Sequence, residues 1–345
     1  MNSSSWASRT SSYDSTEVWR MLMAVLGIES SAHTFGAGVV ERGGILSNSK
    51  IMYKIRSEGM VPMKVADFHV RNARKVIEDA ISKAGIDSGD IEAVGYTKGP
   101  GLGPCLRIGQ ISAKTIARRL GVPLFPVNHC IGHIEITRQS FGMEDPLVLY
   151  VSGGNSQILA LDEHPFRHFK VYGETLDIGI GNMLDNFARA AGLVPAWGSK
   201  VAEVAGGGGY LQMPYTVKGM DFAFTGILTH AIKMLETANL KDVAYSLQET
   251  AFGMVCEATE RALMLSGKAE LLACGGVAQS SRLKEMLGII AESHGARFAA
   301  APNEFNADNG AMIAVVAEKA LRSGSRQEPP IINQKSRPDT VRITW

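Results

Sequence analysis

The chain has 345 residues, and its 35 Lys and Arg residues nearly balance its 34 Asp and Glu residues, for a formal net charge of +1. This balance argues against a protein that binds nucleic acid on its own, because such proteins usually carry a basic face and a high pI. Hydrophobic residues make up 45% of the chain and charged residues 20%, which is typical of a soluble globular protein and allows two domains.

The cysteines and the N-terminus indicate where the protein works. The four cysteines, Cys105, Cys130, Cys256 and Cys274, form no CxxC pair and are too few for a disulfide framework, so we expect a reducing, cytoplasmic location. The apolar runs are shorter than the roughly 18 residues of a membrane span. Residues 1–20 are rich in Ser and Thr and lack the apolar core of a secretory signal, so we expect a disordered tail there.

Predicted strands and helices alternate from residue 24 onward. In the first half we expect strands over 24–30, 35–41, 45–53, 91–97 and 122–127, and helices over 69–85 and 108–120. In the second half we expect strands over 147–152, 156–162 and 269–275, and helices over 183–193, 224–238, 243–266, 281–294 and 309–323. Each half opens on a strand, a turn and a strand, GIESSAHTFGAGVV and then LYVSGGNSQILA. The pattern predicts a two-domain α/β protein with a weak internal duplication.

Two histidines, His129 and His133, stand four residues apart in the segment NHCIGHIE. On a helix this spacing places both imidazoles on one face, within reach of one cation. A merely polar helix face is the alternative, but the apolar neighbours of these histidines favour a buried site that needs partners. The segment is not the H-E-x-x-H signature, because Cys130 stands where that motif has its general base. A metalloprotease is therefore disfavoured.

A third metal ligand has to come from another part of the chain. Asp308, in FNADNGAM, stands at the start of the last predicted helix, where it is either a ligand or a helix cap. One carboxylate and two imidazoles suit Fe, Zn or Mn, and the phenol oxygen of Tyr150 is a candidate fourth ligand.

Two glycine turns are candidate phosphate sites. Ser152, Gly153, Gly154 and Asn155 form either a cradle of backbone N–H groups or simply a tight hairpin turn. The pair Gly275–Gly276 lies between a predicted strand and a predicted helix, where a nucleotide can bind at the helix N-terminus.

Asp185 and the glycine-rich turn at 99–104 are less informative about function. Asp185 is either paired with Arg189 one turn later or is a ligand of ribose hydroxyls. The turn GPGLGP at 99–104 is neither a P-loop nor a GxGxxG turn, so a P-loop NTPase and a Rossmann dehydrogenase are disfavoured.

Eight segments resemble motifs of one family and occur in the same order as in that family. The family is the universal tRNA threonylcarbamoyltransferases, once described as O-sialoglycoprotein endopeptidases. These segments are GIESSAHTFGAGVV, YTKGPGLGP, VNHCIGHIE, LYVSGGNSQI, GETLDIGIGNMLDNFARAAG, PYTVKGMDFAFTGIL, SLQETAF and FNADNGAMIA. The resemblance covers residues 24–345 and is to the archaeal and eukaryotic form, the catalytic subunit of the KEOPS complex.

The resemblance implies a fold and a reaction. The fold is the actin/hexokinase/Hsp70-like (ASKHA) fold, two duplicated α/β domains with the active site in the cleft between them. Subdomain I would comprise 21–148 plus 310–345 and carry the His-x3-His metal motif, and subdomain II would comprise 149–309 and carry the nucleotide-binding turns. The reaction transfers the threonylcarbamoyl group of threonylcarbamoyl-adenylate to N6 of the adenosine 3′ of the anticodon, in tRNAs that read codons starting with A. AMP is the leaving group.

The resemblance also assigns roles to residues of this chain. One divalent metal, Fe or Zn, would be bound by His129, His133 and Asp308, with Tyr150 as a candidate fourth ligand. The phosphate and carbamoyl end of the donor would be bound by Tyr150, Val151, Ser152, Gly153 and Gly154, and the nucleoside by Asp185 and Gly198. The turn at Gly275 and Gly276 and the following Ser280 complete the candidate nucleotide-binding residues.

Two positions depart from the family pattern, and the resemblance leaves one role unassigned. Ala202 replaces a usual Glu, so that either the contact is lost or Glu203 takes it over, and Ser280 replaces a usual Asn. No general base is assigned, although His33 and Glu29 lie near the first hairpin turn and are candidates to face the cleft.

The resemblance further implies partners, namely a small dimerising subunit and a kinase-like ATPase, with tRNA as substrate and no membrane. The near-zero net charge agrees with weak tRNA binding by the isolated chain, because a tRNA footprint needs several Lys or Arg contacts to phosphates. Arg71, Arg74 and Lys75 form only a local basic cluster. A nucleotide-gated ASKHA scaffold without catalysis is the remaining alternative, and such a protein would have no use for a converging metal triad.

Overall fold

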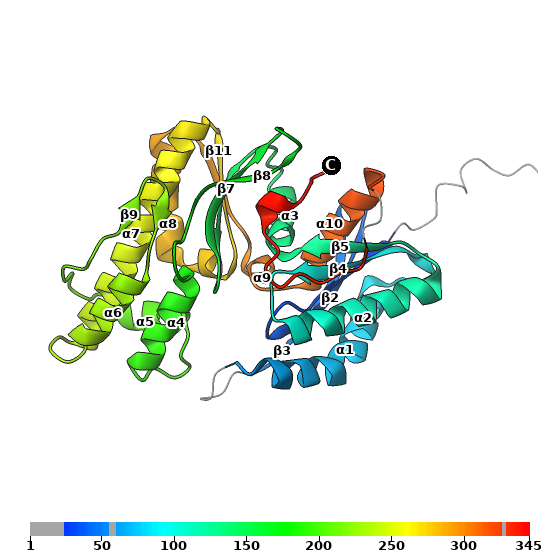
Figure 1. Ribbon diagram of the computed structural model, residues 1–345, viewed down its shortest axis with the longest axis horizontal. Coiled ribbons are helices and arrows are strands. Elements are labelled where there is room, and N and C mark those ends of the chain that lie inside the picture. The colour runs from blue at the N-terminus through cyan, green and yellow to red at the C-terminus, as the bar shows by residue number, and fades with distance from the viewer. Residues whose placement is uncertain (1–23, 55–59, 326–328) are drawn as a thin grey trace, which may run out of the picture.

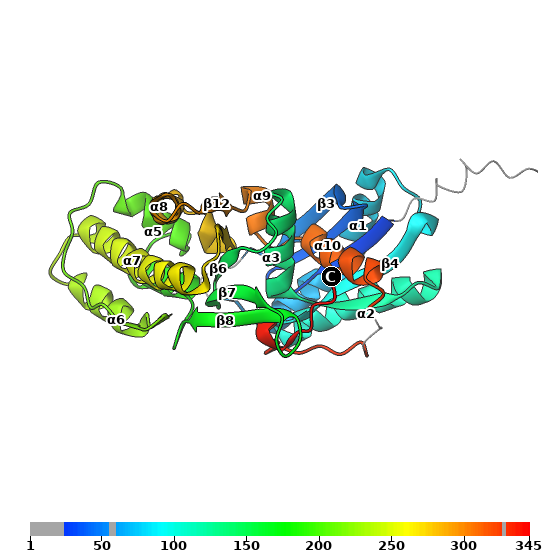
Figure 2. The same cartoon turned by 90° about the horizontal axis from the view of Figure 1, so that it is seen from above.

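The computed structural model describes residues 24–54, 60–325 and 329–345, which fold into two halves that each contain a five-stranded mixed sheet (Figures 1 and 2). The predicted N-terminal tail, 1–20, lies outside the described residues. No helix of the described residues has both the length and the apolar character needed to cross a membrane.

The first sheet has the strand order β3-β2-β1-β4-β5. Its strands are β1 (Ala24–Glu29), β2 (Thr34–Glu41), β3 (Gly44–Met52), β4 (Ile91–Gly99) and β5 (Leu124–Asn128). The strands β1, β2 and β3 form an antiparallel meander, and β4 and β5 continue the sheet parallel to β1. Its helices are α1 (Pro62–Ala84) and α2 (Gly103–Leu120) on one face, and α3 (His129–Ser140) and α10 (Gly310–Arg322) on the other.

The second sheet has the strand order β12-β11-β6-β7-β8. Its strands are β6 (Leu147–Val151), β7 (Ser156–Asp162), β8 (His168–Glu174), β11 (Glu270–Cys274) and β12 (Arg297–Ala300). The strands β6, β7 and β8 form an antiparallel meander, and β11 and β12 run parallel to β6. The topology of the first half is thus repeated, which confirms the predicted duplication.

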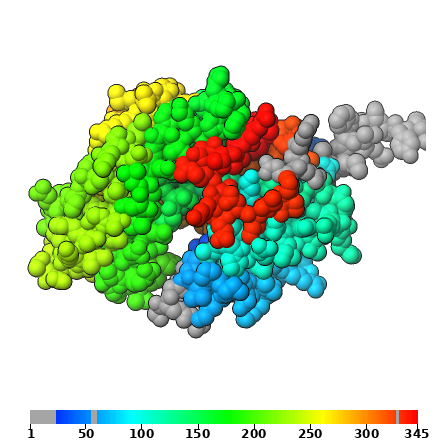
Figure 3. All heavy atoms as spheres, viewed as in Figure 1, coloured from blue at the N-terminus to red at the C-terminus, as the bar shows by residue number. Residues whose placement is uncertain are grey.

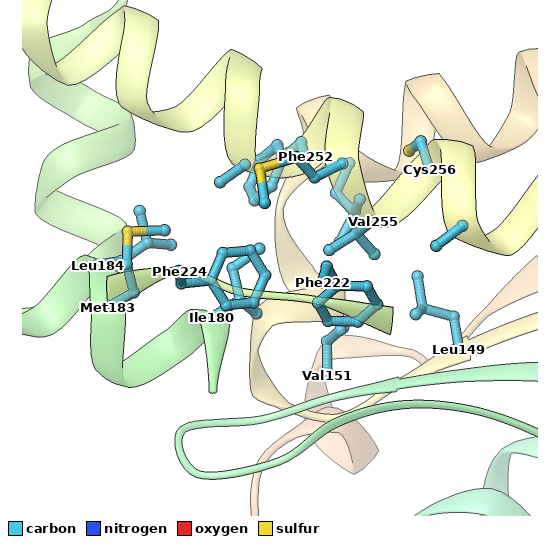
Figure 4. Close-up of a cluster of buried hydrophobic side chains, with 14 of the residues drawn as sticks. Leu149, Val151, Ile180, Met183, Leu184, Phe222, Phe224, Phe252, Val255 and Cys256 are labelled. Atoms are coloured by element: carbon cyan, nitrogen blue, oxygen red, sulfur yellow. The ribbon is translucent and has the colours of Figure 1, made fainter. Parts of the chain in front are cut away.

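Helices on one face of the second sheet enclose the core of that half. They are α4 (Ile180–Ala190), α5 (Gly198–Ala205), α6 (Thr225–Met234), α7 (Leu240–Ser266) and α8 (Ser281–Ser293). Small elements join the larger ones: β9 (Val217–Lys218), β10 (Asp221–Phe222), α9 (Asn303–Asn306), and the 3-10 helices η2 (Ser88–Asp90), η3 (Gly276–Gln279) and η4 (Pro338–Thr340). Figure 4 shows Phe222 and Phe224 packed between Val151 on β6 and Phe252 on α7.

A separate core cluster joins the two halves and places the site. It combines Val25 of the first sheet with Tyr150 of the second, with Ile131 of α3 and Met312 of α10 in the same cluster. The helix α10 can lie directly on β1 because Gly27 has no side chain: a Cβ atom there would be 2.2 Å from the Ala314 nitrogen. The residues just before α10 are therefore held at the end of the first sheet.

The predicted strands and helices are largely confirmed, and the differences lie at helix starts and in short elements. The helix predicted over 69–85 begins at Pro62 and the helix predicted over 108–120 begins at Gly103, since proline in the first turn starts a helix rather than ending it. The helix α3 was not predicted as an element, although the spacing of its two histidines was read on a helix. The strand β8, which carries mixed polar and apolar residues, and the short elements α5, β9, β10, α9 and β12 were not predicted either.

Candidate active site

The end of the first sheet brings together residues that are distant in the sequence. The strands β1, β4 and β5 are parallel, so their carboxyl ends meet at one edge, which is where ligands bind in open α/β sheets. Glu29 ends β1, and His129 follows the last residue of β5. The Asn128 side chain accepts hydrogen bonds from the amides of Cys130 and Ile131, so the first turn of α3 is capped and His129 is fixed in direction.

Three predicted metal ligands converge at this edge. The carboxylate oxygen Oδ1 of Asp308 lies 3.5 Å from Nε2 of His129 and 3.4 Å from Nε2 of His133. The potential ligand atoms of the three residues all lie within 4.8 Å of one another. Both histidines are buried, and Asp308 is half-buried. We call these three residues the His-His-Asp cluster.

Glu29 supports the His-His-Asp cluster from behind. Its side chain is completely buried, and Oε2 lies 3.1 Å from Nδ1 of His129 while accepting a 2.6 Å hydrogen bond from the Thr97 hydroxyl. The backbone amide of Ser31 donates to its other oxygen at 2.5 Å. A carboxylate on Nδ1 leaves Nε2 of His129 directed at the cluster, as in the carboxylate–histidine pairs of metal sites. The sequence analysis placed Glu29 near the first hairpin turn but did not pair it with His129.

The charges in this region are strongly coupled. Burial lowers the pKa of His129, but the carboxylates of Glu29 and Asp308 outweigh burial and raise that pKa to about 9. Burial raises the pKa of Asp308, but the charge of His129 outweighs it and holds this pKa below its usual range. Burial lowers the pKa of His133. Without a metal, the first imidazole is therefore charged at neutral pH and the second is neutral.

Tyr150 lies next to the cluster at the end of β6. Its ring centroid is 5.8 Å from that of His133, and the whole side chain is buried. Among the described residues its hydroxyl oxygen makes no well-formed hydrogen bond, and the side chains of Ser152 and Cys130 are its polar neighbours. A buried hydroxyl without a well-formed hydrogen bond is costly, so this oxygen is a fitting addition to a cation-binding set.

The predicted glycine turn forms the β6–β7 hairpin. The Ser152 amide donates to the Asn155 carbonyl at 2.8 Å, which closes the turn. Gly153 and Gly154 are exposed, and in the described part of the chain their amide groups donate to no protein acceptor. Gly179, just before α4, allows the close contact of that helix with the hairpin, since a Cβ atom there would be 2.4 Å from the Gly153 carbonyl oxygen.

The remaining predicted nucleotide residues lie on neighbouring elements of the second half. Asp185 on α4 accepts a 2.7 Å hydrogen bond from the Gly198 amide, which joins α4 to the start of α5. Glu203 is exposed and paired with Lys200 at 2.7 Å. Ala202 beside it is also exposed.

The second glycine pair packs against the first turn. Gly275 is buried with φ +96°, and a Cβ atom there would be 2.4 Å from the Val151 carbonyl oxygen. Gly276 is exposed, and Ser280 uses its hydroxyl as the N-cap of α8. The side chain of Val151 points into the core, so only its backbone can contact a ligand (Figure 4).

Comparison with known proteins identifies the family. The family model for tRNA N6-adenosine threonylcarbamoyltransferase (TsaD) matches residues 44–315. A tRNA N6-adenosine threonylcarbamoyltransferase of Thermofilum pendens is 45% identical over 329 residues, which cover 94% of this chain and 97% of the relative. The enzyme of the same name from Thermococcus kodakarensis is 43% identical over 328 residues, 94% of this chain and 100% of the relative.

The chain belongs to the tRNA N6-adenosine threonylcarbamoyltransferase family. As a threonylcarbamoyltransferase it is an enzyme of tRNA modification. A relative from Methanothermobacter thermautotrophicus, named a probable bifunctional tRNA threonylcarbamoyladenosine biosynthesis protein, is 43% identical, and the match covers 94% of this chain and 61% of the relative.

Solved structures place this threonylcarbamoyltransferase in the ASKHA fold, as the sequence analysis expected. HypF from T. kodakarensis matches with a TM-score of 0.61 and 13% identity, over 89% of this chain and 49% of HypF. An activator of 2-hydroxyisocaproyl-CoA dehydratase from Clostridium difficile matches with a TM-score of 0.51 and 14% identity, over 88% of this chain and 97% of the activator. At such low identity the similarity concerns the fold alone.

Proposed function

We propose that the chain transfers the threonylcarbamoyl group of threonylcarbamoyl-adenylate to N6 of the adenosine 3′ of the anticodon, in tRNAs that read codons starting with A. The observation that carries this proposal is the convergence of His129, His133 and Asp308 beside the second half, where Tyr150 packs on His133 and Asn155 of the glycine hairpin contacts Cys130. Family membership supplies the reaction class. In this proposal the threonylcarbamoyl end of the donor lies at the edge of the first sheet, and its phosphate and nucleoside lie at the edge of the second.

The His-His-Asp cluster fits one divalent metal ion. Two imidazole nitrogens and a carboxylate oxygen form a donor set that Fe and Zn accept, and the buried hydroxyl of Tyr150 is our candidate for a fourth ligand. Glu29 supplies the supporting acceptor on Nδ1 of His129. A metal bound there would act as a Lewis acid toward the carbamoyl oxygen or would bind the threonine end of the donor.

The glycine hairpin fits the phosphate of the adenylate. The amide groups of Gly153 and Gly154 are free to donate, and such preorganised donors stabilise the charge that develops on a leaving phosphate. In the transfer, N6 of adenosine forms a bond to the carbamoyl carbon, the carbon–oxygen bond to the phosphate breaks, N6 loses a proton, and AMP leaves with the bonding electron pair. Since N6 is a poor nucleophile, its alignment with the carbamoyl carbon supplies much of the acceleration.

The nucleoside end of the donor would lie on the second half. We assign Asp185 and Gly198 to the ribose and base, together with the turn at Gly275 and Gly276 and the hydroxyl of Ser280. Asp185 uses one oxygen for the Gly198 amide and keeps the other for a ribose hydroxyl. Because Glu203 is exposed and paired with Lys200, we assign it no contact with the nucleotide.

We further propose that the chain works in the cytoplasm as the catalytic subunit of a KEOPS-type complex, with a small dimerising subunit and a kinase-like ATPase. The net charge of +1 agrees with an enzyme that depends on partners to hold tRNA. The free, buried state of all four cysteines agrees with a reducing compartment. We keep the division into subdomain I, 21–148 plus 310–345, and subdomain II, 149–309, as part of this proposal.

The test is a transfer assay. Purified protein and its partner subunits receive synthetic threonylcarbamoyl-adenylate and unmodified tRNA, and the nucleosides are analysed by mass spectrometry. We expect threonylcarbamoyladenosine at the position 3′ of the anticodon, and none in a tRNA that carries another base there. Absence of the product with all partners present and folded would contradict the proposal and favour a nucleotide-gated scaffold.

A further inference from the structure

A cavity of about 650 Å³ lies between the end of β3 and the first turns of α1, outside the residues assigned above. Among the described residues, its lining includes three cations, Lys54, Lys64 and Arg71, and one carboxylate, Asp67. Lys64, Asp67 and Arg71 follow the i, i+3, i+7 spacing and therefore share one face of α1. The described part of the lining therefore carries more positive than negative side chains, although the whole chain is nearly neutral.

Two of these cations have no ion-pair partner in the part of the chain that the structure describes. Farther along α1, Arg74 is paired with Glu78 at 2.7 Å. By contrast, neither Lys54 nor Arg71 takes part in an ion pair within the described residues, and both side chains are exposed. Unpaired, solvent-accessible cations around a hollow are suited to bind phosphate groups.

The cavity also has an aromatic wall. The rings of Tyr53 and Phe68 lie 5.6 Å apart with an interplanar angle of 72°, and both side chains are half-buried in the lining. RNA loops are recognised through unstacked bases that stack on aromatic side chains, and this stacking accompanies phosphate contacts along the strand. Cations and rings together fit single-stranded RNA better than a free anion.

The cavity and the His-His-Asp cluster lie at the same edge of the first sheet. Because β3 runs parallel to β1, it ends at the same edge as Glu29, and the Tyr53 amide donates to the His33 carbonyl at 2.8 Å in the turn after β1. Lys50 lies two residues before the end of β3, donates to the Glu304 carbonyl at 3.3 Å, and is close enough to Asp308 for their charges to interact. Figure 3 shows blue atoms of the first half bordering an opening toward the green atoms of the second half.

We propose that this cavity binds the anticodon loop of the tRNA substrate, with Lys54 and Arg71 on its phosphates and Tyr53 and Phe68 against an unstacked base, while the target adenosine lies at the His-His-Asp cluster. The inference rests on the proposed function for the identity of the RNA. It adds the surface on which that RNA lies.

The test compares two double variants of the full chain that remove the same amount of positive charge from the same end of the first half. Lys54→Ala/Arg71→Ala removes the cavity cations, and Arg74→Ala/Lys75→Ala removes two neighbours outside the cavity. Binding of fluorescent, unmodified tRNA is measured over a series of salt concentrations, and thermal unfolding checks the fold. In the assembled complex, the same variants are assayed for the KM for tRNA and for kcat.

We expect the cavity variant to bind tRNA about tenfold more weakly. The slope of the logarithm of the binding constant against the logarithm of the salt concentration should become shallower by about 1.4, because each of two lost phosphate contacts contributes about 0.7 for single strands. The conservative Lys54→Arg/Arg71→Lys variant should restore binding, and the control variant should change affinity by less than about twofold. Tyr53→Leu should weaken binding by at least about fivefold with an unchanged salt slope, because stacking releases no counterions. In the assay, the KM should rise while kcat at saturating tRNA stays constant.

Equal losses of tRNA affinity in the cavity and control variants would overturn the proposal, because tRNA would then be attracted by the overall positive charge of this surface and not by the cavity. Unchanged tRNA affinity together with lost assembly with partner subunits would also overturn it, in favour of an acidic protein surface. If the wild-type complex shows no transfer at all, the proposed function fails, while the binding comparison still decides whether this cavity holds RNA.

Discussion

At the edge of the first sheet the site consists of buried side chains, whereas at the edge of the second sheet it consists of exposed backbone. His129, His133 and Glu29 are each no more than 7% exposed. Glu29 contacts His129, and Asp308 contacts both histidines. Gly153 and Gly154 are exposed and offer only amide groups. The two edges have the same topology, so the difference comes from the residues placed at the strand ends rather than from the fold.

The difference separates two tasks. A metal needs ligand atoms at fixed positions, and burial with supporting contacts supplies this rigidity. A nucleotide that must enter and leave needs donors that remain accessible and a backbone that can come close. Substitutions in the first edge should therefore affect the metal, and substitutions in the second edge should affect the nucleotide.

The largest effect is expected from His129→Ala. It removes one of the proposed metal ligands and leaves Glu29 buried without its imidazole partner, so we expect loss of stoichiometric metal and a fall in transfer larger than the about 10–100-fold typical of changes in supporting residues. Metal content is measured by mass spectrometry and transfer by nucleoside analysis. Normal binding of AMP by this variant would show that the second edge is intact.

Glu29→Gln should have the next largest effect. The amide keeps the volume but removes the charge that orients His129, so metal affinity should fall by about 10–100-fold while the ligands remain in place. Competition with a metal-binding dye measures the affinity. An unchanged affinity would mean that Glu29 only stabilises the fold and does not tune the metal site.

The pH dependence of metal binding tests the charges at the first edge. In the metal-free protein the pKa of His129 is about 9, so a metal must displace one proton there, while burial lowers the pKa of His133 and leaves no proton to displace. The apparent affinity for Zn²⁺ should therefore rise about tenfold per unit between about pH 6.5 and about pH 8.5. A hundredfold rise per unit would show that both histidines are protonated, and a flat profile would show that neither is.

At the second edge, Gly179→Ala should weaken nucleotide binding by about tenfold, a typical loss when donors move by a fraction of an ångström. The new Cβ atom would lie 2.4 Å from the Gly153 carbonyl oxygen, so the hairpin has to move away from α4. Calorimetry with AMP measures the affinity. The matched control is Gly226→Ala on α6, where a Cβ atom meets nothing within 4 Å. Loss of metal in the Gly179 variant would contradict the separation of the two edges.

The smallest effect is expected from Glu203→Ala. The side chain is exposed and paired with Lys200, and surface ion pairs contribute only about 0–1 kcal/mol. Nucleotide affinity should change by less than about twofold. A larger loss would show that Glu203 turns toward the nucleotide and takes over the contact missing at Ala202.

The sequence predicts much of this comparison because its signals are local. The i, i+4 spacing of His129 and His133 predicts two imidazoles on one helix face, and the repeated strand–turn–strand segments predict the duplicated topology. Pairs of glycines predict the two turns at the second edge. The ligand role of Asp308 was left open against a helix cap, and it is Asn309 that caps α10.

Contacts between distant segments could not be predicted in the same way. The pairing of Glu29 with His129 depends on the parallel order of β1, β4 and β5, which no local pattern encodes. The basic cavity likewise depends on the end of β3 lying beside α1. In the sequence, Arg71 groups with Arg74 and Lys75, whereas in the structure it faces the cavity with Lys54.

The measurement that tests the account most directly is metal content and transfer activity on one preparation, before chelation, after chelation and after addition of Fe or Zn. We expect one metal per chain, loss of transfer when the metal is removed, recovery when it returns, and no recovery in His129→Ala. Full transfer by the chelated, metal-free enzyme would contradict the assignment of the His-His-Asp cluster as a metal centre of the reaction.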